Sequence, residues 1–187
     1  MIGLVLSGGK SLRMGKDKGL ILNEQSIPWA KQAFDLLLLG NMNVFVSINS
    51  KQRQTYSYFF SQSVLIEDET DLPIEGPLKG LLSAHNQFPN ESIFALACDM
   101  PNMTIKQISS LIYFSKENPK YDAWAYLNEE NKEPLCAIYS ISLLNNLITN
   151  LSLNFSLTHI LSFAKTAYLK VPVSEKICFE NINYLKP

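Results

Sequence analysis

Short, uninterrupted apolar runs recur along this chain, and segments with helical periodicity separate them. Apolar runs of this length, bounded by turn residues, are typical of strands that are buried on both faces. Their alternation with helices indicates a mostly parallel sheet between two layers of helices, in a three-layer α/β fold. We predict strands over residues 2–6, 43–48, 64–66 and 92–98, and helices over 28–39, 52–60, 76–87 and 104–116.

The pattern after residue 120 is less regular. Two strands are expected at 123–127 and 135–140, on either side of a polar segment at 128–133. Helices are expected over 143–151 and 157–164, and a final strand over 168–173. With 187 residues the chain has the size of one domain, so we interpret residues 1–187 as a single unit.

The composition argues against several classes of function. A net charge of −1 predicts no broad basic surface for nucleic acid or for an anionic membrane. No apolar run approaches the roughly 20 residues that span a bilayer, and we recognise no signal peptide. Cys98, Cys136 and Cys178 are far apart and form no C-x-x-C pair. This cysteine usage favours a reducing cytoplasm over a disulfide framework or a zinc site.

The first expected strand runs into a loop rich in glycine and positive charge, Leu6-Ser7-Gly8-Gly9-Lys10-Ser11-Leu12-Arg13-Met14-Gly15-Lys16-Asp17-Lys18. Adjacent glycines allow backbone N–H groups to approach a ligand closely. Backbone donors and cations after a strand suit a polyphosphate, although an ordinary loop with solvated charges is the alternative. It is not a P-loop, because Lys16 is followed by Asp17 and not by Ser or Thr, and G-x-G-x-x-G is also missing.

Two carboxylates also follow expected strands. Asp99 precedes Met100-Pro101, and proline holds the chain before it extended. A carboxylate at such a strand tip suits Mg²⁺, while a turn-forming aspartate is the alternative. Asp68 lies in an acidic segment, for which a solvated loop is the alternative. In a parallel sheet the glycine-rich loop, Asp68 and Asp99 all fall on one edge, where such folds bind ligands.

The glycine-rich loop resembles that of the molybdenum cofactor guanylyltransferases, a family of small nucleotidyltransferases with a Rossmann-like fold. Further matching motifs follow in the same order as in that family. They are Ile66-Glu67-Asp68, Gly76-Pro77-Leu78-Lys79-Gly80-Leu81, Ala97-Cys98-Asp99-Met100-Pro101, Pro134-Leu135 and Asn181-Ile182-Asn183.

The resemblance implies an enzyme that transfers GMP from GTP to molybdopterin, releases pyrophosphate, uses Mg²⁺ and contacts other proteins of molybdenum cofactor assembly. It implies a nucleotide-binding half at 1–120 and an acceptor half at 121–187. Arg13, Lys18 and Asp99 would be catalytic, with Asp99 also holding the metal. The implied nucleotide contacts are Leu6, Ser7, Gly8, Gly9, Lys18, Ser47, Asp68 and Asp99, and the implied acceptor contacts are Gly76, Gly80, Asn181 and Asn183.

The chain departs from the family pattern at two places that keep alternatives open. Ser47 stands where relatives usually carry Asn, and the chain continues after Asn183 as Tyr184-Leu185-Lys186-Pro187. The alternatives are a nucleotidyltransferase that uses CTP or a sugar phosphate, and a non-catalytic nucleotide-binding adaptor that delivers molybdenum cofactor. Leu6-Ser7-Gly8-Gly9 resembles the guanylyl branch more than the cytidylyl branch.

Overall fold

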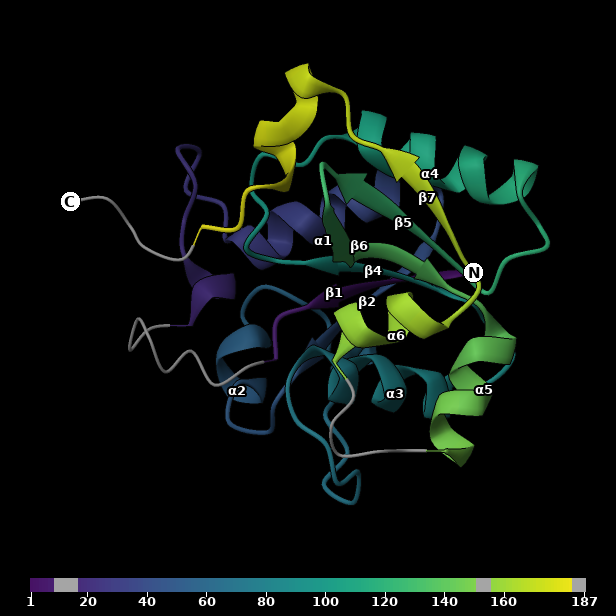
Figure 1. Cartoon of the computed structure of the whole chain (residues 1–187). Helices are drawn as coiled ribbons and strands as arrows, with labels where there is room; N and C mark the ends of the chain where they lie inside the picture. Colours follow the sequence, from purple (N-terminus) through teal and green to yellow (C-terminus); the bar gives the residue numbers. More distant parts are fainter. Residues whose placement is uncertain (9–16, 151–155, 183–187) are drawn as a thin grey trace.

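The computed structural model describes residues 1–8, 17–150 and 156–182, and within these the strands form one sheet in the order β3-β2-β1-β4-β6-β5-β7 (Figure 1). The strands are β1 (Ile2–Leu6), β2 (Asn43–Ile48), β3 (Leu65–Glu67), β4 (Ile93–Ala97), β5 (Ala123–Asn128), β6 (Asn131–Tyr139) and β7 (Thr166–Lys170). Their positions confirm the predicted strands, with shifts of a few residues at the ends.

The sheet is mostly parallel. β1 pairs in parallel with both β2 and β4, β2 with β3, and β5 with β7, whereas β6 is antiparallel to both of its neighbours. The order 3-2-1-4 places a topological switch between β1 and β4, because the chain leaves β1 toward β2 and β3 and returns on the other side as β4. Open α/β sheets bind ligands at such a switch, outside the carboxyl ends of the strands.

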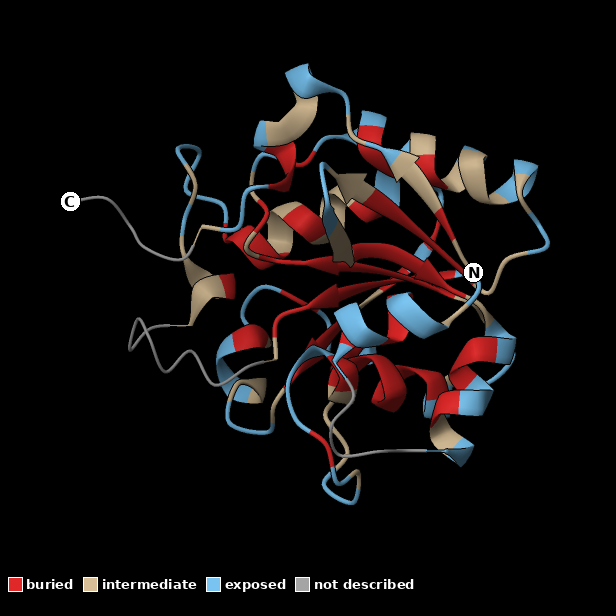
Figure 2. Ribbon diagram, in the orientation of Figure 1, coloured by how far each residue is buried: buried red, intermediate tan, exposed pale blue. Residues whose placement is uncertain are grey.

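Helices cover both faces of the sheet and give the predicted three layers (Figure 1). α1 (Trp29–Leu39) and α4 (Ile105–Glu117) pack on one face, and α3 (Pro77–Gln87), α5 (Ile141–Thr149) and α6 (Leu157–Phe163) pack on the other. The strands are buried through the middle of the molecule, and each helix buries the side that faces them (Figure 2).

Two helices begin as their sequences require. α4 starts with a capping box, in which the side chains of Thr104 and Gln107 cap each other's backbone N–H groups. α3 starts with Gly76 at φ 72°, a conformation that glycine adopts without strain, followed by Pro77 at the first helical position. Pro28, predicted as the first residue of α1, is instead its N-cap, because its ψ of 140° is extended.

The helix predicted over 52–60 was wrong in length. α2 covers only Arg53–Tyr56 and continues as turns, in which Tyr56 and Phe60 are both buried. The spacing of Tyr56 and Phe60 allows both side chains to pack against the core, and a series of turns places them there as well as a helix would. The Ser57 hydroxyl donates to the carbonyl of Gln54 at 2.7 Å, a local bond that competes with the helix.

The polar segment at 128–133 was expected to separate two strands, but most of it belongs to those strands and forms a tight hairpin. Asn128 pairs with Asn131 across a turn in which Glu129 has φ 58°, and β6 therefore begins at Asn131 instead of residue 135. Short 3₁₀ helices, which the sequence pattern did not predict, occur at η1 (Lys18–Leu20), η2 (Gln62–Val64) and η3 (Val173–Phe179).

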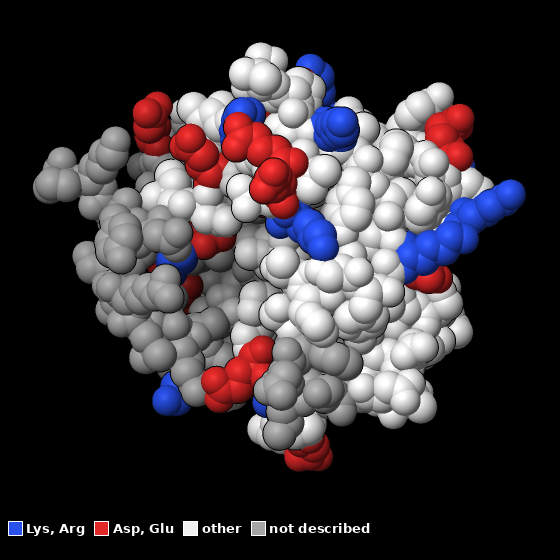
Figure 3. Space-filling view, viewed as in Figure 1, with Lys and Arg blue, Asp and Glu red and all other residues white. Residues whose placement is uncertain are grey.

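The described helices include none with the length and apolar character needed to cross a membrane. On the face in view, acidic and basic side chains lie close to one another rather than forming one broad surface of a single sign (Figure 3). Cys98, Cys136 and Cys178 are free and buried. Trp29 and Trp124 are also buried.

Candidate active site at the carboxyl edge of the sheet

The segments that follow β1, β2, β3 and β4 meet at one edge of the sheet. The backbone N–H groups of Ser7 and Gly8 donate to the carbonyl of Ser47 at 3.1 and 2.9 Å, which joins the ends of β1 and β2. The Asp68 N–H donates to the Ile48 carbonyl at 2.8 Å and continues the pairing of β2 with β3. The convergence predicted from the strand pattern is therefore present. The backbone N–H groups of Ser7 and Gly8 are therefore used to join β1 to β2.

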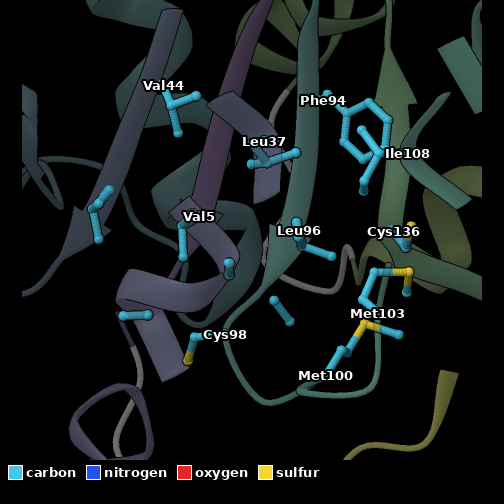
Figure 4. Close-up of a cluster of buried hydrophobic side chains, with 14 of the residues drawn as sticks. Val5, Leu37, Val44, Phe94, Leu96, Cys98, Met100, Met103, Ile108 and Cys136 are labelled. Atoms are coloured by element: carbon cyan, nitrogen blue, oxygen red, sulfur yellow. The ribbon is translucent and has the colours of Figure 1, made fainter. Parts of the chain in front are cut away.

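The hydrophobic core drawn in Figure 4 underlies this edge of the sheet. Val5 of β1 and Leu96 of β4 lie within one buried cluster, and Cys98 continues it toward Asp99. The Cys98 N–H donates to the Leu6 carbonyl at 3.3 Å, so the residue before Asp99 remains tied to the end of β1. Burial, with a smaller contribution from the neighbouring Asp99 carboxylate, raises the pKa of the Cys98 thiol to about 12. The thiol therefore stays neutral.

Lys18 and Asp99 form an ion pair at the switch between β1 and β4. The Lys18 ammonium lies 2.7 Å from Asp99 Oδ2, and the two side chains are 21% and 16% exposed. Lys18 is the first residue of η1, and Asp99 directly follows β4 and Cys98. The pair joins residues 81 positions apart in sequence, at the point where this fold class binds its ligands.

Asp99 has the chemistry needed to hold Mg²⁺. It is a hard oxygen donor, partly exposed, and a cation already lies against it in the form of the Lys18 ammonium. Mg²⁺ commonly takes only one or two carboxylates and completes its shell with phosphate oxygens and water. No group of three or more His, Cys, Asp or Glu side chains in the described part of the chain has the arrangement of a metal site. The residues present therefore fit a metal that is carried by a nucleotide.

Asp68 forms a second polar site beside β2. The Ser47 hydroxyl donates to Asp68 Oδ1 at 3.1 Å, and Gly8 and Gly80 leave room for the carboxylate from two sides. A Cβ on Gly8 would lie 3.0 Å from Asp68 Oδ2. Burial raises the pKa of Asp68, while the Ser47 hydroxyl and the positive charge of Lys79 counteract the rise.

The two glycines of the Gly76–Gly80 motif are required for different structural reasons. Gly76 is exposed, has open space around its Cβ position, and is needed for its positive φ. Gly80 is buried in α3, and a Cβ there would lie 2.1 Å from Ser47 Oγ. Gly80 therefore belongs spatially to the Asp68 site, although the resemblance suggested a contact with the acceptor.

The C-terminal segment returns to Asp99. The Ile182 N–H donates to the Asp99 carbonyl at 3.1 Å, which brings the exposed Asn181 next to the site. Gly9, Arg13 and Asn183, also expected at the site, lie outside the described residues.

Sequence reasoning assigned no role to three side chains that support this edge. Asp17 precedes Lys18, and its carboxylate accepts hydrogen bonds from Gln52 and Tyr56. The sequence offered two signals. Asp17 is an acidic residue inside a cationic loop, and Gln52 and Tyr56 are a polar and an aromatic residue four positions apart. Neither feature by itself indicates that the groups meet.

The sheet is mostly parallel and carries a cation–carboxylate pair at its switch point, where α/β folds bind ligands. Comparison with known proteins identifies the class as a nucleotidyltransferase. The chain belongs to the MobA-like NTP transferase domain family, whose model matches residues 3–165. This match confirms the resemblance drawn from the motifs.

Named relatives agree with the family. The chain is 31% identical over 140 residues to a molybdenum cofactor biosynthesis bifunctional protein of Synechocystis, covering 75% of this chain but only 39% of that protein. It is 31% identical over 142 residues to a molybdenum cofactor guanylyltransferase of Campylobacter jejuni, covering 75% and 69% of the two chains. Among solved structures, molybdopterin-guanine dinucleotide biosynthesis protein A of Archaeoglobus fulgidus shares the fold with a TM-score of 0.76 at 23% identity, covering 98% and 92%.

Proposed function

We propose that this protein transfers GMP from GTP to a molybdopterin-type cofactor and releases pyrophosphate. The observation that carries the proposal is the Lys18–Asp99 pair at the β1–β4 switch, since it sets a cation and a metal-binding carboxylate side by side. The name of the Campylobacter jejuni relative supports the choice of nucleotide and acceptor, and the name of the Synechocystis relative supports the choice of acceptor.

In this proposal Lys18 binds the nucleotide phosphates together with Arg13, whose planar group donates to two oxygens at once. The Lys18 ammonium, 2.7 Å from Asp99, is placed to contact both the carboxylate and a phosphate oxygen. Asp99 holds Mg²⁺, which supplies charge neutralisation for the phosphates when it is bound.

The reaction exchanges one phosphoanhydride bond for another. A terminal phosphate oxygen of the acceptor forms a bond to the α-phosphorus of GTP, and the bond from that phosphorus to the bridging oxygen of the β-phosphate breaks. The electron pair leaves with pyrophosphate. The attacking phosphate is already an anion, so the chain needs no general base, and Lys18 stabilises the charge that develops on the leaving group.

The Asp68 site fits the guanine base. An ionised carboxylate accepts from both the ring N–H and the amino group of guanine, whereas cytosine presents no ring N–H on its pairing edge. Ser47 holds Oδ1 of Asp68, and Lys79 favours its ionised form. Ser47 replaces the amide of most relatives, so in this protein Asp68 would carry the selection of the base.

We further propose that residues 1–120 form the nucleotide half and 121–187 the acceptor half. The contact of Ile182 with the Asp99 carbonyl supports this division, because it brings the end of the chain to the nucleotide edge beside Asn181. The unpaired, buried cysteines support a cytoplasmic setting. Acceptor delivery would involve other proteins of molybdenum cofactor assembly.

The test measures pyrophosphate release from GTP with Mg²⁺ and molybdopterin, alongside calorimetric titration with GTP, CTP and ATP. We expect release only when acceptor is present, and the tightest binding for GTP. Asp99→Ala should abolish release and the dependence on Mg²⁺. Asp122→Ala is the matched control, since Asp122 precedes β5 at the opposite edge and bonds Ser142. Tighter binding of CTP would refute the base assignment, and GTP binding without turnover would favour the adaptor.

A further inference from the structure

The side chain of Gln52 joins the two ends of the glycine-rich loop. Its Nε2 group donates to the Ser7 carbonyl at 3.1 Å and to Asp17 Oδ2 at 2.6 Å. Its Oε1 accepts from the backbone N–H of Asn49 at 2.8 Å, which fixes the orientation of the amide. Ser7 lies near the start of the loop and Asp17 near its end, so one side chain bridges the two ends.

Tyr56 forms a hydrogen bond with the other carboxylate oxygen of Asp17. Its hydroxyl donates to Asp17 Oδ1 at 3.0 Å, and the ring is fully buried. The backbone N–H of Gly19 donates to the same oxygen at 3.0 Å. A Cβ on Gly19 would lie 2.1 Å from the Tyr56 hydroxyl, so the glycine is what allows this close approach.

These contacts leave little freedom to the backbone of Lys18. Asp17 precedes it and is held by Gln52 and Tyr56, and Gly19 follows it against the same Tyr56 hydroxyl. Burial, with the nearby negative charge of Asp17, keeps the pKa of Tyr56 far above its ordinary value. The hydroxyl therefore remains a donor across the physiological pH range.

We propose that Gln52 and Tyr56 are positioning residues for the nucleotide phosphates, which act through Asp17 to set Lys18 against Asp99. The proposal rests on the proposed function and adds residues that come from the segment after β2. Their effect is preorganisation: a lysine whose backbone is already held has less freedom to lose when it binds a triphosphate.

The role predicts a specific pattern of losses. Affinity for a nucleoside triphosphate should fall when the support is removed, because in the proposed function Lys18 binds the nucleotide phosphates. Affinity for the corresponding monophosphate should change little, since the base site at Ser47 and Asp68 makes no hydrogen bond to Gln52 or Tyr56.

Two variants remove the support with small changes in shape, and each has a matched control on the same segment. Tyr56→Phe removes only the hydroxyl, and Tyr58→Phe does the same at a tyrosine that is 78% exposed. Gln52→Glu removes the two donors but keeps the acceptor for Asn49, and Gln54→Glu makes the same change at an exposed position. Gln52 is half-buried, so its variant keeps the test decisive should Tyr56→Phe fail to fold.

The measurement is calorimetric affinity for Mg-GTP and for GMP, together with the thermal unfolding midpoint. We expect the Kd for GTP to rise on the order of tenfold in Tyr56→Phe and Gln52→Glu, as expected for loss of a charge-assisted hydrogen bond. The controls should match the wild type.

Unchanged GTP affinity in folded variants would overturn the proposal, and so would an equal loss for GTP and GMP, which indicates a general structural effect. If the wild type prefers CTP, the proposed base selection fails. The role of Gln52 and Tyr56 is then tested by the same comparison with CTP and CMP in place of GTP and GMP. If it binds no triphosphate, both proposals fail.

A donor–acceptor exchange tests the contact directly. Asp17→Asn places an amide opposite the Gln52 amide, and we expect a loss of GTP affinity similar to that of Gln52→Glu. The double variant Asp17→Asn/Gln52→Glu restores one donor facing one acceptor. We expect it to recover part of the affinity of either single variant, although the Ser7 carbonyl still lacks its donor. Strictly additive losses would show that the two side chains do not act through each other.

Discussion

Gly80→Ala is the substitution for which local propensity and packing make opposite predictions. In the interior of α3 alanine is favoured over glycine by about 1 kcal/mol. The added Cβ would, however, lie 2.1 Å from Ser47 Oγ, 3.0 Å from Ser47 Cβ and 3.4 Å from Asp68 Oδ1. The first two distances are far inside van der Waals contact, so Ser47 or the helix must move.

The magnitude follows from which groups move. Overpacking of a buried site costs about 1–3 kcal/mol. Rotation of Ser47 away from the new methyl group breaks its hydrogen bond to Asp68, and such bonds to charged groups contribute about 1.5–3 kcal/mol. After adding these two costs and subtracting the propensity gain, we expect a net loss of about 3 kcal/mol in the free energy of unfolding, or about 6–12 °C in the midpoint for a chain of this size.

The assay is denaturant and thermal unfolding of Gly80→Ala, with Gly76→Ala as the comparison. Gly76 also loses stability, because its φ of 72° strains an alanine, but nothing lies within 4 Å of its Cβ position. In a Ser47→Gly background, which lacks both close atoms, Gly80→Ala should cause no further loss of stability, whereas Gly76→Ala should cost the same as in the wild type. A Gly80→Ala protein as stable as the wild type would refute the steric reasoning.

Three further predictions follow from the same edge of the sheet. Lys18→Ala should lower kcat/KM for GTP by about 100-fold. Lys31→Ala, which breaks an ion pair with Asp35 and a contact with the Phe34 ring, should not, and equal effects of the two variants in steady-state assays would contradict the role of Lys18. Burial raises the pKa of Asp68, so the folded state binds more protons there than the unfolded state, and stability at this site falls as pH rises through the two pKa values. Asp68→Asn should therefore stabilise the protein most at neutral pH, measured by unfolding from pH 4 to 8, and a difference that does not grow with pH would oppose this. Cys98, buried and with its pKa raised to about 12, should react with an alkylating reagent only after unfolding, and rapid labelling of the native protein would show that the core beneath Asp99 opens.

The strands were the most predictable part of the fold. β1 and β2 match their predicted bounds because both are continuous apolar runs between turn residues. The error in α2 has a physical cause, since Tyr56 and Phe60 have helical spacing but are buried by a series of turns. The hairpin at Glu129 was missed because no glycine marks its positive φ, and a non-glycine residue rarely adopts that conformation.

The site was predictable where a residue directly follows a strand. Asp68 and Asp99 were expected at one edge on that ground, and the structure places both there. Side chains that meet only because of the order of the strands in the sheet were not predictable. Gln52 lies 45 residues from Ser7 and 35 from Asp17, and only the pairing of β2 beside β1 brings the three together.

The position of β6 explains why the nucleotide half is the better-specified part of this chain. The strands on the β3 side of the switch are parallel to β4, so each ends at the site and contributes the residues that follow it. β6 is antiparallel to β4, so it begins at this edge, through a hairpin, and its following residues leave from the opposite edge. The described contact of the acceptor half with Asp99 comes from the segment after η3, through the backbone N–H of Ile182. Such contacts tolerate changes in length and sequence, which accords with motifs that match the family well over about the first 140 residues and poorly over about the last 45.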